Sequence, residues 1–543
     1  MTATVEAQTG TFGYLALWDA IAGVVGERDC LVQNGRRQSW AQTRERTLAL
    51  GWWLTARTEG RRAGEHQPWE SPNDLVGVYV RNRPEFLETV LGCYRARCAP
   101  FNVNYRYRAA ELAYLLRDAA PAVLVYQQEF APVLREALAG RPAAPVLVCV
   151  ADDSGEQPVA GSVDYEQVIA TAVAPPVERV PSGDDVHVLY TGGTTGMPKG
   201  VIWRQRDAIP GPCGIAVGSI AQAVEGAPRR EWLRALPAPP LMHGTALWYA
   251  FNAWSSGGTV VLGDNPVHFD ATEMVATLQR ERISSLAIVG DVFARPLLDA
   301  LAATPEPPEH LRFVFSSGAV LSQRSWSGFR EHFPRATIIN ALGSSETGPQ
   351  ANQTGGDATF TAGPNTFVLD EKTGVLRDRT RPGQGLLANG GFLPRGYLGD
   401  PERTRRTFRT IDGRYLAVSG DRAEIDADGA VTFLGRDATV INTGGEKVYA
   451  EEVESVLLAH PGVADALVLG RPSERWGSEV VALLVADGSD DTVSDAALTA
   501  AVKAQLAGYK APKTFLRVEK IRRYDNGKPD YAWARAQLER GDE

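Results

Sequence analysis

LYTGGTTGMPKG, residues 189–200, follows an apolar run from Val186 to Leu189 that has the composition of a buried strand. Its four glycines let the backbone approach a ligand closely and expose successive N–H groups, which form an anion-binding nest. Hydroxyl groups and one ammonium group add further donors, so the loop matches a triphosphate. The loop residues expected to contact that ligand are Thr191, Gly192, Gly193, Thr194, Thr195, Gly196 and Lys199.

This loop is not a Walker A motif. Lys199 stands between Pro198 and Gly200, whereas a Walker A lysine is preceded by glycine and followed by Ser or Thr. A Gly/Thr-rich turn without a ligand is the alternative interpretation, and glycines alone would favour it. Three threonines and a lysine in this order favour phosphate binding instead.

Strands and helices alternate on both sides of the loop. The apolar run 75–80 precedes Pro84, which suits the first turn of a helix. The run 259–262 precedes a second helix, where Asp270 and Glu273 have the spacing of a capping box. Such repetition predicts α/β layers with largely parallel sheets.

The pattern changes after about Val375, where short strands separated by glycine turns replace the alternation. Asp426 to Gly429 reads as one such hairpin turn. A compact α+β unit follows Gly435-Arg436. We therefore predict two domains, residues 1–436 and residues 437–543.

Composition excludes several classes of protein. The formal charge of −9 argues against nucleic acid as a partner, because phosphate neutralisation needs a basic surface. No stretch approaches the ~18 to 20 apolar residues of a membrane span, and residues 1–10 do not resemble a signal peptide. Five cysteines without a CxxC pair and seven scattered histidines without HExxH predict a reduced, cytoplasmic protein without an intrinsic transition-metal site.

YTGGTTGMPKG resembles the signature loop of the adenylate-forming superfamily, which includes acyl-CoA synthetases, nonribosomal peptide adenylation domains and luciferase. The resemblance covers about residues 15 to 536, with further motifs in the expected order. It implies a large N-terminal domain with two mainly parallel α/β layers and a distorted β-barrel. A small mobile α+β domain would complete the chain.

The adenine-binding motifs follow from this resemblance. FSSGA, residues 315–319, is similar to the family's adenine-binding strand end, formed here by Ser317, Gly318 and Ala319. ALGSSET, residues 341–347, matches a motif usually written YGxTE. It implies that Leu342, Gly343 and Ser344 line the nucleotide, that Ser345 supplies a phosphate hydroxyl and that Glu346 holds Mg²⁺. Leu342 replaces an aromatic residue that stacks on adenine in many relatives.

Four later motifs complete the resemblance. Asp421 in SGD would accept both ribose hydroxyls, and Arg436 would lie near the ribose and phosphates. The hinge would be Asp437 or Ala438, where the sequence departs from the usual pattern. Gly444 and Gly445 would line a pantetheine tunnel, and the terminal NGK would supply the catalytic lysine, Lys528.

The acid-binding pocket is expected beside Pro239 to Thr245. There the resemblance places His243 and Gly244. The apolar Val289 and Phe293 could form part of the pocket wall, with a role in the hydrophobic core as the alternative. No aspartate stands in residues 236–248 to pair with a substrate ammonium, which favours a plain carboxylic acid over an amino acid. The motifs at 435–454 and 526–535 look most like actinobacterial ligases for long-chain, steroid-side-chain or terpenoid acids.

The main prediction is therefore ATP-dependent activation of a hydrophobic carboxylic acid through acyl-AMP, followed by transfer to coenzyme A, with Mg²⁺ as cofactor. An adenylation-only enzyme that hands acyl-AMP to a downstream ligase or carrier is the first alternative. A non-catalytic nucleotide-binding relative is the second. Relatives are frequently homodimers.

Lys528→Ala should abolish acyl-AMP formation and spare thioester formation from supplied acyl-AMP. The resemblance implies that this lysine bridges the acid carboxylate and the α-phosphate in the first half-reaction alone. Pyrophosphate release measures the first half-reaction and thioester accumulation measures the second. Equal loss of both would contradict the assignment of Lys528.

Overall fold

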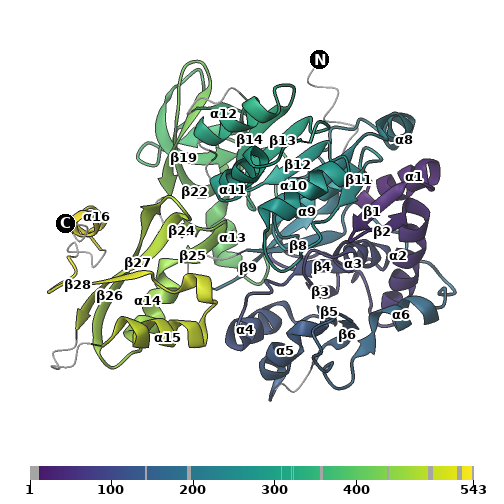
Figure 1. Cartoon of the computed structure of the whole chain (residues 1–543), viewed down its shortest axis with the longest axis horizontal. Coiled ribbons are helices and arrows are strands. Elements are labelled where there is room, and N and C mark those ends of the chain that lie inside the picture. Colours follow the sequence, from purple (N-terminus) through teal and green to yellow (C-terminus); the bar gives the residue numbers. More distant parts are fainter. Residues whose placement is uncertain are drawn as a thin grey trace. The chain divides into compact units, whose positions relative to one another are not determined.

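The computed structural model describes residues 12–140, 144–191, 197–306, 308–318, 321, 323–354, 359–436, 440–486, 493–522 and 529–540. The chain divides into two compact units (Figure 1). The larger unit comprises residues 1–105, 116–191 and 200–435, and the smaller comprises residues 106–115, 192–199 and 436–543. Among the described residues, no helix combines the length and apolar character that crossing a membrane requires.

The first sheet of the larger unit has eight strands in the order β20-β9-β8-β4-β3-β5-β6-β7. Neighbouring strands from β8 to β7 run parallel, and β20 pairs with β9 antiparallel. The strands are β3 (Leu75–Tyr79), β4 (Ala99–Asn102), β5 (Val123–Gln127), β6 (Val146–Val150), β7 (Val163–Asp164), β8 (Val186–Thr191), β9 (Lys199–Arg204) and β20 (Gly396–Tyr397).

The second sheet has fifteen strands and two halves of different character. The neighbours are parallel from β1 through β11, β10, β12 and β13 to β14. The pairs from β14·β15 to β16·β23 and those among β17, β18, β19 and β22 are antiparallel. The parallel half and its antiparallel edge β2 contain β1 (Asp29–Gln33), β2 (Arg36–Ser39), β10 (Arg234–Pro237), β11 (Thr259–Val261), β12 (Ser285–Ile288), β13 (Phe313–Ser317) and β14 (Thr337–Ser344). The other half contains β15 (Gly348–Gln353), β16 (Phe360–Ala362), β17 (Thr366–Leu369), β18 (Leu376–Arg377), β19 (Gly383–Asn389), β21 (Phe408–Ile411), β22 (Arg414–Ile425) and β23 (Ala430–Arg436).

The predicted mainly parallel α/β layers are confirmed, but the distorted β-barrel is not found as a closed sheet in the part of the chain that the structure describes. β16 pairs with both β15 and β23, so the strands beyond Val375 continue the large sheet. That continuation leaves β18 as a sheet edge. The hairpin turn predicted at Asp426 to Gly429 is confirmed between β22 and β23, but Gly420 lies inside β22 and separates no strands. The sequence also could not reveal the partner of β16.

Helices cover these sheets (Figure 1). α10, α11 and α12 pack on the parallel half of the large sheet, and a second core joins both sheets through α1, α3 and α9. The helices are α1 (Tyr14–Val25), α2 (Trp40–Thr55), α3 (Pro84–Arg95), α5 (Ala131–Leu138), α6 (Tyr165–Thr171), α7 (Gln205–Ala208), α8 (Ile220–Gly226), α9 (Gly244–Trp254), α10 (Ala271–Arg280), α11 (Gly290–Ala302), α12 (Gln323–His332) and α13 (Pro401–Thr407). Two short 3₁₀ turns are η1 (Gln128–Phe130) and η2 (Ala227–Arg230), and α4 (Ala109–Ala119) is divided between the two units.

The smaller unit is the predicted α+β fold. Its five-stranded sheet has the order β25-β24-β27-β26, with β28 parallel to β27. Side chains alternate between two cores, one under α14 and α15 and the other under α16. The elements are β24 (Val440–Thr443), β25 (Glu446–Tyr449), α14 (Ala450–Leu458), β26 (Val463–Ser473), β27 (Gly477–Ala486), α15 (Asp495–Gln505), η3 (Gly508–Lys510), β28 (Thr514–Arg517) and α16 (Tyr531–Arg540).

Helix starts follow the sequence signals with one exception. Pro84 is the first residue of α3, and Asp270 caps α10 by accepting hydrogen bonds from the N–H groups of Thr272 and Glu273. The prediction of a complete capping box, in which the Glu273 side chain would accept from the Asp270 N–H, is wrong. The Glu273 carboxylate accepts a hydrogen bond from the Asp264 N–H instead.

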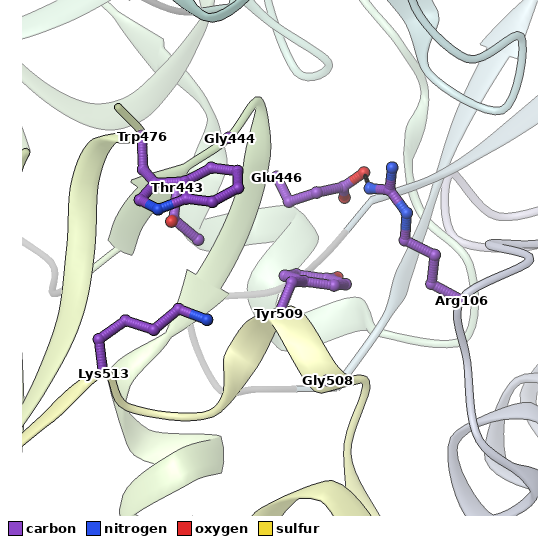
Figure 2. A pocket seen from close by; sticks show the side chains of 8 residues that line it. All are labelled: Arg106, Thr443, Gly444, Glu446, Trp476, Gly508, Tyr509 and Lys513. Carbon is purple, nitrogen blue, oxygen red and sulfur yellow. Dashed lines mark ion pairs between the residues drawn. The ribbon is translucent and has the colours of Figure 1, made fainter. Parts of the chain in front are cut away.

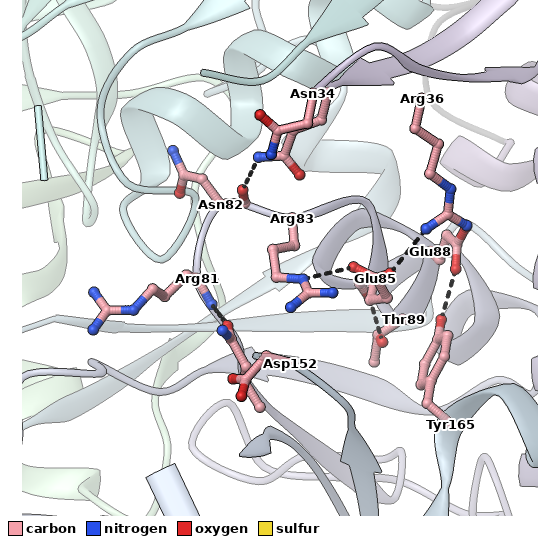
Figure 3. Close-up of polar contacts among 12 residues, drawn as sticks. Asn34, Arg36, Arg81, Asn82, Arg83, Glu85, Glu88, Thr89, Asp152 and Tyr165 are labelled. Carbon is pink, nitrogen blue, oxygen red and sulfur yellow. Dashed lines mark hydrogen bonds and ion pairs between the residues drawn. The ribbon is translucent and has the colours of Figure 1, made fainter. Parts of the chain in front are cut away.

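Helix α3 also carries two buried carboxylates, which Figure 3 shows with their partners. Arg36 and Arg83 pair with Glu85, and the Tyr165 hydroxyl donates to Glu88 at 2.9 Å. Burying a charge is costly unless it is paired, so these contacts allow α3 to pack with both carboxylates inside.

His187 on β8 is a buried histidine beside an aromatic cluster. Its Nδ1 forms a 2.9 Å hydrogen bond with the Tyr94 hydroxyl, and its ring meets Trp248 edge-on. Its Nε2 has no hydrogen-bond partner within the described part of the chain. Burial lowers the pKa of His187 from 6.5 to about 3, so the imidazole stays neutral in the folded protein.

The free energy of unfolding should therefore fall as the pH drops below about 6.5. His187 binds a proton in the unfolded chain but not in the folded protein. This lowers the free energy of unfolding by about 1.4 kcal/mol per pH unit between the two pKa values. Replacing His187 with Asn should remove this contribution to the pH dependence of the free energy of unfolding. Denaturant titrations between about pH 5 and 6 measure that dependence. Equal slopes for the wild type and the variant would contradict the prediction.

Candidate active site

The ends of the glycine loop are fixed by two strands of the eight-stranded sheet. Thr191 is the last residue of β8 and Lys199 is the first residue of β9. Gly192, Gly193, Thr194, Thr195 and Gly196 lie outside the described residues. The structure therefore places the two anchors of the loop at the carboxyl end of β8 and the amino end of β9.

The predicted magnesium ligand Glu346 lies in the turn between β14 and β15. The Tyr397 hydroxyl donates a hydrogen bond to Glu346 Oε1 at 2.8 Å. Burial, then the Glu346 charge, raises the pKa of Tyr397 well above its usual range, so the phenol remains a donor. One carboxylate oxygen of Glu346 is thereby oriented by a fixed neighbour.

The same turn is tied to the strand that follows the glycine loop. The Trp203 indole N–H on β9 donates to the Ser345 carbonyl at 2.9 Å, and Tyr397 on β20 is the register partner of Val201. The Glu346 N–H also donates to the Ser344 hydroxyl at 3.3 Å. These contacts bring the Ser345–Glu346 turn next to the strand that leaves the glycine loop.

Gly343 and Leu342 occupy a bulge in β14. A Cβ atom on Gly343 would lie closer than 3.0 Å to the carbonyl oxygen of Gly348, so the backbone approach excludes any side chain there. Leu342 is partly buried and packs against the apolar cluster that contains Leu387 and Val431. Glycine at this position is thus dictated by packing between two strands.

The predicted adenine-binding turn lies beside the predicted acid pocket. Ser317 ends β13, and Gly318 has a positive φ of 88° that favours glycine. A Cβ on Gly318 would lie 3.7 Å from Val289 Cγ1 and 3.9 Å from Thr245 Oγ1. The structure thus brings the 315–318 strand end, Val289 and the start of α9 together, while Ala319 lies outside the described residues.

His243 and Gly244 form the start of α9. His243 occupies the N-cap position without a side-chain cap, and a Cβ on Gly244 would lie 3.0 Å from Leu189 on β8. Phe293 is 9% exposed and its ring contacts Phe269, 4.7 Å away between centroids. Phe293 therefore contributes to the core under α11.

Asp421, the predicted ribose ligand, lies in the long strand β22 and is 3% exposed. The Ser419 hydroxyl donates to its Oδ2 at 2.9 Å. On neighbouring β19, the Asn389 amide donates to the Thr347 carbonyl at 2.8 Å. One strand therefore connects the SGD segment to the Ser345–Glu346 turn.

In the smaller unit, Gly444 and Gly445 form the turn between β24 and β25, both with positive φ. This turn borders a cavity of about 360 Å³. The residues that line the cavity are Arg106, Thr443, Gly444, Glu446, Trp476, Gly508, Tyr509 and Lys513 (Figure 2).

The cavity combines cations with flat aromatic faces. Arg106 forms an ion pair with Glu446 and lies 5.7 Å from the centre of the Tyr509 ring. In Figure 2 the Lys513 side chain extends toward the space between the Trp476 and Tyr509 rings. A phosphate-bearing aromatic ligand would find both charge and stacking surface here.

Several predicted residues are not placed by the structure. Lys528, Asp437 and Ala438 lie outside the described residues, and the Arg436 side chain is not described although its backbone ends β23. Conversely, the sequence motifs did not predict a role at the site for Tyr397, for Trp203 or for the aromatic and basic residues of the cavity. None of these belongs to a glycine-rich motif, and the only available signal was the apolar strand containing Trp203.

Two family models and several characterised relatives match the sequence of this chain. A family model described as AMP-binding enzyme matches residues 18–398, and one described as AMP-binding enzyme C-terminal domain matches residues 452–528. The chain is 41% identical to medium-chain acyl-CoA ligase Mig from Mycobacterium avium, over 98% of this chain and 99% of the relative. It is 35% identical to 3-oxocholest-4-en-26-oate–CoA ligase from Rhodococcus rhodochrous, over 95% and 94% respectively.

Solved structures show the same fold. The structure of amide bond synthetase McbA from Marinactinospora thermotolerans superposes with a TM-score of 0.77 at 23% identity, covering 97% of this chain and 99% of that one. Since the family model alone spans residues 18–398 of 543, and the relatives align along nearly the whole chain, the chain belongs to the family of AMP-binding enzymes.

Proposed function

We propose that this chain is an acyl-CoA synthetase that activates a hydrophobic carboxylic acid with ATP and transfers the acyl group from acyl-AMP to coenzyme A. The observation that carries the proposal is the contact set around Glu346. Tyr397 orients its carboxylate, and Trp203 ties its turn to the strand that leaves the glycine loop. An oriented carboxylate beside a phosphate-binding loop is the arrangement that a nucleotide–metal complex requires.

Mg²⁺ fits the residues present at this turn. Glu346 is partly exposed and its Oε1 accepts a hydrogen bond from Tyr397, and carboxylate oxygens are the hard ligands that Mg²⁺ prefers. Bound there, the ion would neutralise charge on the phosphates as the acid carboxylate approaches. Ser345 would add a hydroxyl donor, and Asp421 would accept the ribose hydroxyl groups.

Coenzyme A transfer is supported by the cavity beside Gly444. Coenzyme A carries an adenine ring and several phosphate groups. The cavity presents two aromatic rings and the cation Lys513, whereas Arg106 is already paired with Glu446. We further propose that residues 437–543 act as the mobile domain, presenting Lys528 for adenylation and then the Gly444–Gly445 turn for thioester formation. This arrangement favours one chain for both half-reactions over the adenylation-only alternative.

The acid is proposed to be a medium-chain, long-chain or polycyclic acid of the steroid or terpenoid type. The two relatives described above are named for a medium-chain and a steroid acid, and residues 236–248 contain no aspartate for an ammonium group. A cytoplasmic location and a homodimer complete the proposal.

Incubating the purified chain with ATP, Mg²⁺ and a panel of acids tests this function. Pyrophosphate release should be fastest with medium-chain, long-chain or steroid acids, because an apolar wall gains free energy with each buried methylene group. Adding coenzyme A should convert the product to a thioester. A preference for acetate or a free amino acid would contradict the substrate class, and pyrophosphate release without thioester would favour the adenylation-only enzyme.

Trp476→Ala should raise the KM for coenzyme A about tenfold, because the partly exposed aromatic surface that lines the cavity is lost. ATP–pyrophosphate exchange, which reports acyl-AMP formation without coenzyme A, should keep the wild-type rate. Trp232→Ala is the matched control, since Trp232 is 45% exposed and belongs to the larger unit. An unchanged KM in Trp476→Ala, or a parallel loss of exchange, would contradict the assignment of the cavity.

A further inference from the structure

Three buried or half-buried asparagines stand near the ends of adjacent parallel strands of the eight-stranded sheet. Asn102 is the last residue of β4, Asn82 follows β3 and Asn73 precedes β3. Each uses its side-chain amide to bond backbone groups of another segment. Their hydrogen-bond partners differ: the Asn102 side chain bonds both β8 and the 239–245 segment, whereas Asn82 and Asn73 each bond one of the two.

The Asn102 side chain forms hydrogen bonds with both the N–H and the carbonyl group of Tyr190. The Tyr190 N–H donates to Asn102 Oδ1 at 2.7 Å, and Asn102 Nδ2 donates to the Tyr190 carbonyl at 2.8 Å. Tyr190 is followed by Thr191, where β8 ends and the glycine loop begins. This pair of bonds fixes the last residues before the loop.

The same Asn102 amide nitrogen also donates to the Met242 carbonyl at 2.7 Å. Met242 directly precedes His243 and the start of α9. Asn102 is 5% exposed, so all three bonds lie in the interior, where an unmade bond is costly. One side chain therefore joins the start of the glycine loop to the middle of the acid-flanking segment, residues 239–245.

We propose that Asn102 is a positioning residue that sets the affinity for ATP and for the carboxylic acid together. This inference rests on the proposed function, which assigns the loop after Tyr190 to the phosphates and residues 239–245 to the acid. In adenylation the acid carboxylate must meet the α-phosphate, so the two segments need a fixed spacing. Asn102 fixes that spacing without touching either substrate.

Asn82 supplies a partial comparison. Its Nδ2 donates to the Pro239 carbonyl at 3.0 Å, and the Leu241 N–H donates to its Oδ1 at 2.7 Å. Asn82 is labelled in Figure 3. These two bonds hold the acid-flanking segment alone, because neither reaches β8.

Asn73 is the matched structural control. It is fully buried, and its Oδ1 accepts a hydrogen bond from the N–H of Val186 at 3.1 Å. Its Nδ2 donates to the Arg97 carbonyl and to Asp185. Asn73 therefore makes the same kinds of bond as Asn102 to the same strand, but at the end of β8 far from the loop.

The experiment compares Asn102→Ala, Asn82→Ala and Asn73→Ala in the full chain by pyrophosphate release. Loss of a buried amide with several partners should raise the KM for both ATP and acid about tenfold in Asn102→Ala. Asn82→Ala should raise the KM for the acid alone. Asn73→Ala should lower the melting temperature as Asn102→Ala does and leave both KM values within about twofold of the wild type.

KM separates positioning from stability, because a reduced amount of folded enzyme lowers the apparent kcat and leaves KM unchanged. If Asn102→Ala does not fold, Asn102→Asp replaces it. Its carboxylate still accepts from the Tyr190 N–H but cannot donate to either carbonyl group. The inference is overturned if the Asn102 variant changes neither KM, or only one of them.

Calorimetric titration with ATP keeps this test independent of the proposed function. If the wild type releases no pyrophosphate with any acid, the proposed function fails. Asn102→Ala must then still weaken ATP binding relative to Asn73→Ala. Equal ATP affinity of the two variants would overturn the positioning role of Asn102.

Discussion

The hydrogen bond from Tyr397 to Glu346 fixes the orientation of the carboxylate that we propose as the magnesium ligand. Glu346 lies in the turn between β14 and β15, whereas Tyr397 is buried on a strand paired with β9. A carboxylate that must meet a charged ligand loses less conformational freedom when a neighbour already orients it. The phenol serves this purpose well because its burial keeps it protonated.

Polar groups in the larger unit gather where parallel strands end. Thr191, Asn102 and the Ser317–Gly318 pair stand at the carboxyl ends of β8, β4 and β13. Ligand sites of α/β sheets characteristically lie outside these ends, since the backbone there is released from the sheet and side chains can converge. The antiparallel half contributes Asp421 and Asn389 from β22 and β19, so both halves of the large sheet serve the same region of the unit.

Much of the fold could be predicted from the sequence because its signals are local. Pro84 starts α3, the apolar run 313–315 lies within β13, and Asp426 turns β22 into β23. The large sheet could not be predicted, because the pairing of β16 with β23 joins residues about seventy positions apart through backbone groups that every residue carries.

The site divides in the same way. Motif residues such as Glu346, Gly318 and Asp421 could be named from their order in the chain. Their partners Tyr397 and Trp203 could not, since a single tyrosine or tryptophan has no pattern until folding brings it to its acceptor. The roles of Lys528 and of residues 192–196 rest on resemblance to the family, because the described residues do not include them.

Gly343 and Leu342 are adjacent, yet the fold restricts amino-acid substitutions at the two positions to very different extents. The carbonyl oxygen of Gly348 fills the space beside Gly343, so steric exclusion alone requires glycine at this position. Leu342 is only partly buried and rests against an apolar cluster that tolerates other shapes. The two neighbouring positions therefore differ in the substitutions that the fold permits: Leu342 can change in size and shape, whereas Gly343 cannot gain a side chain.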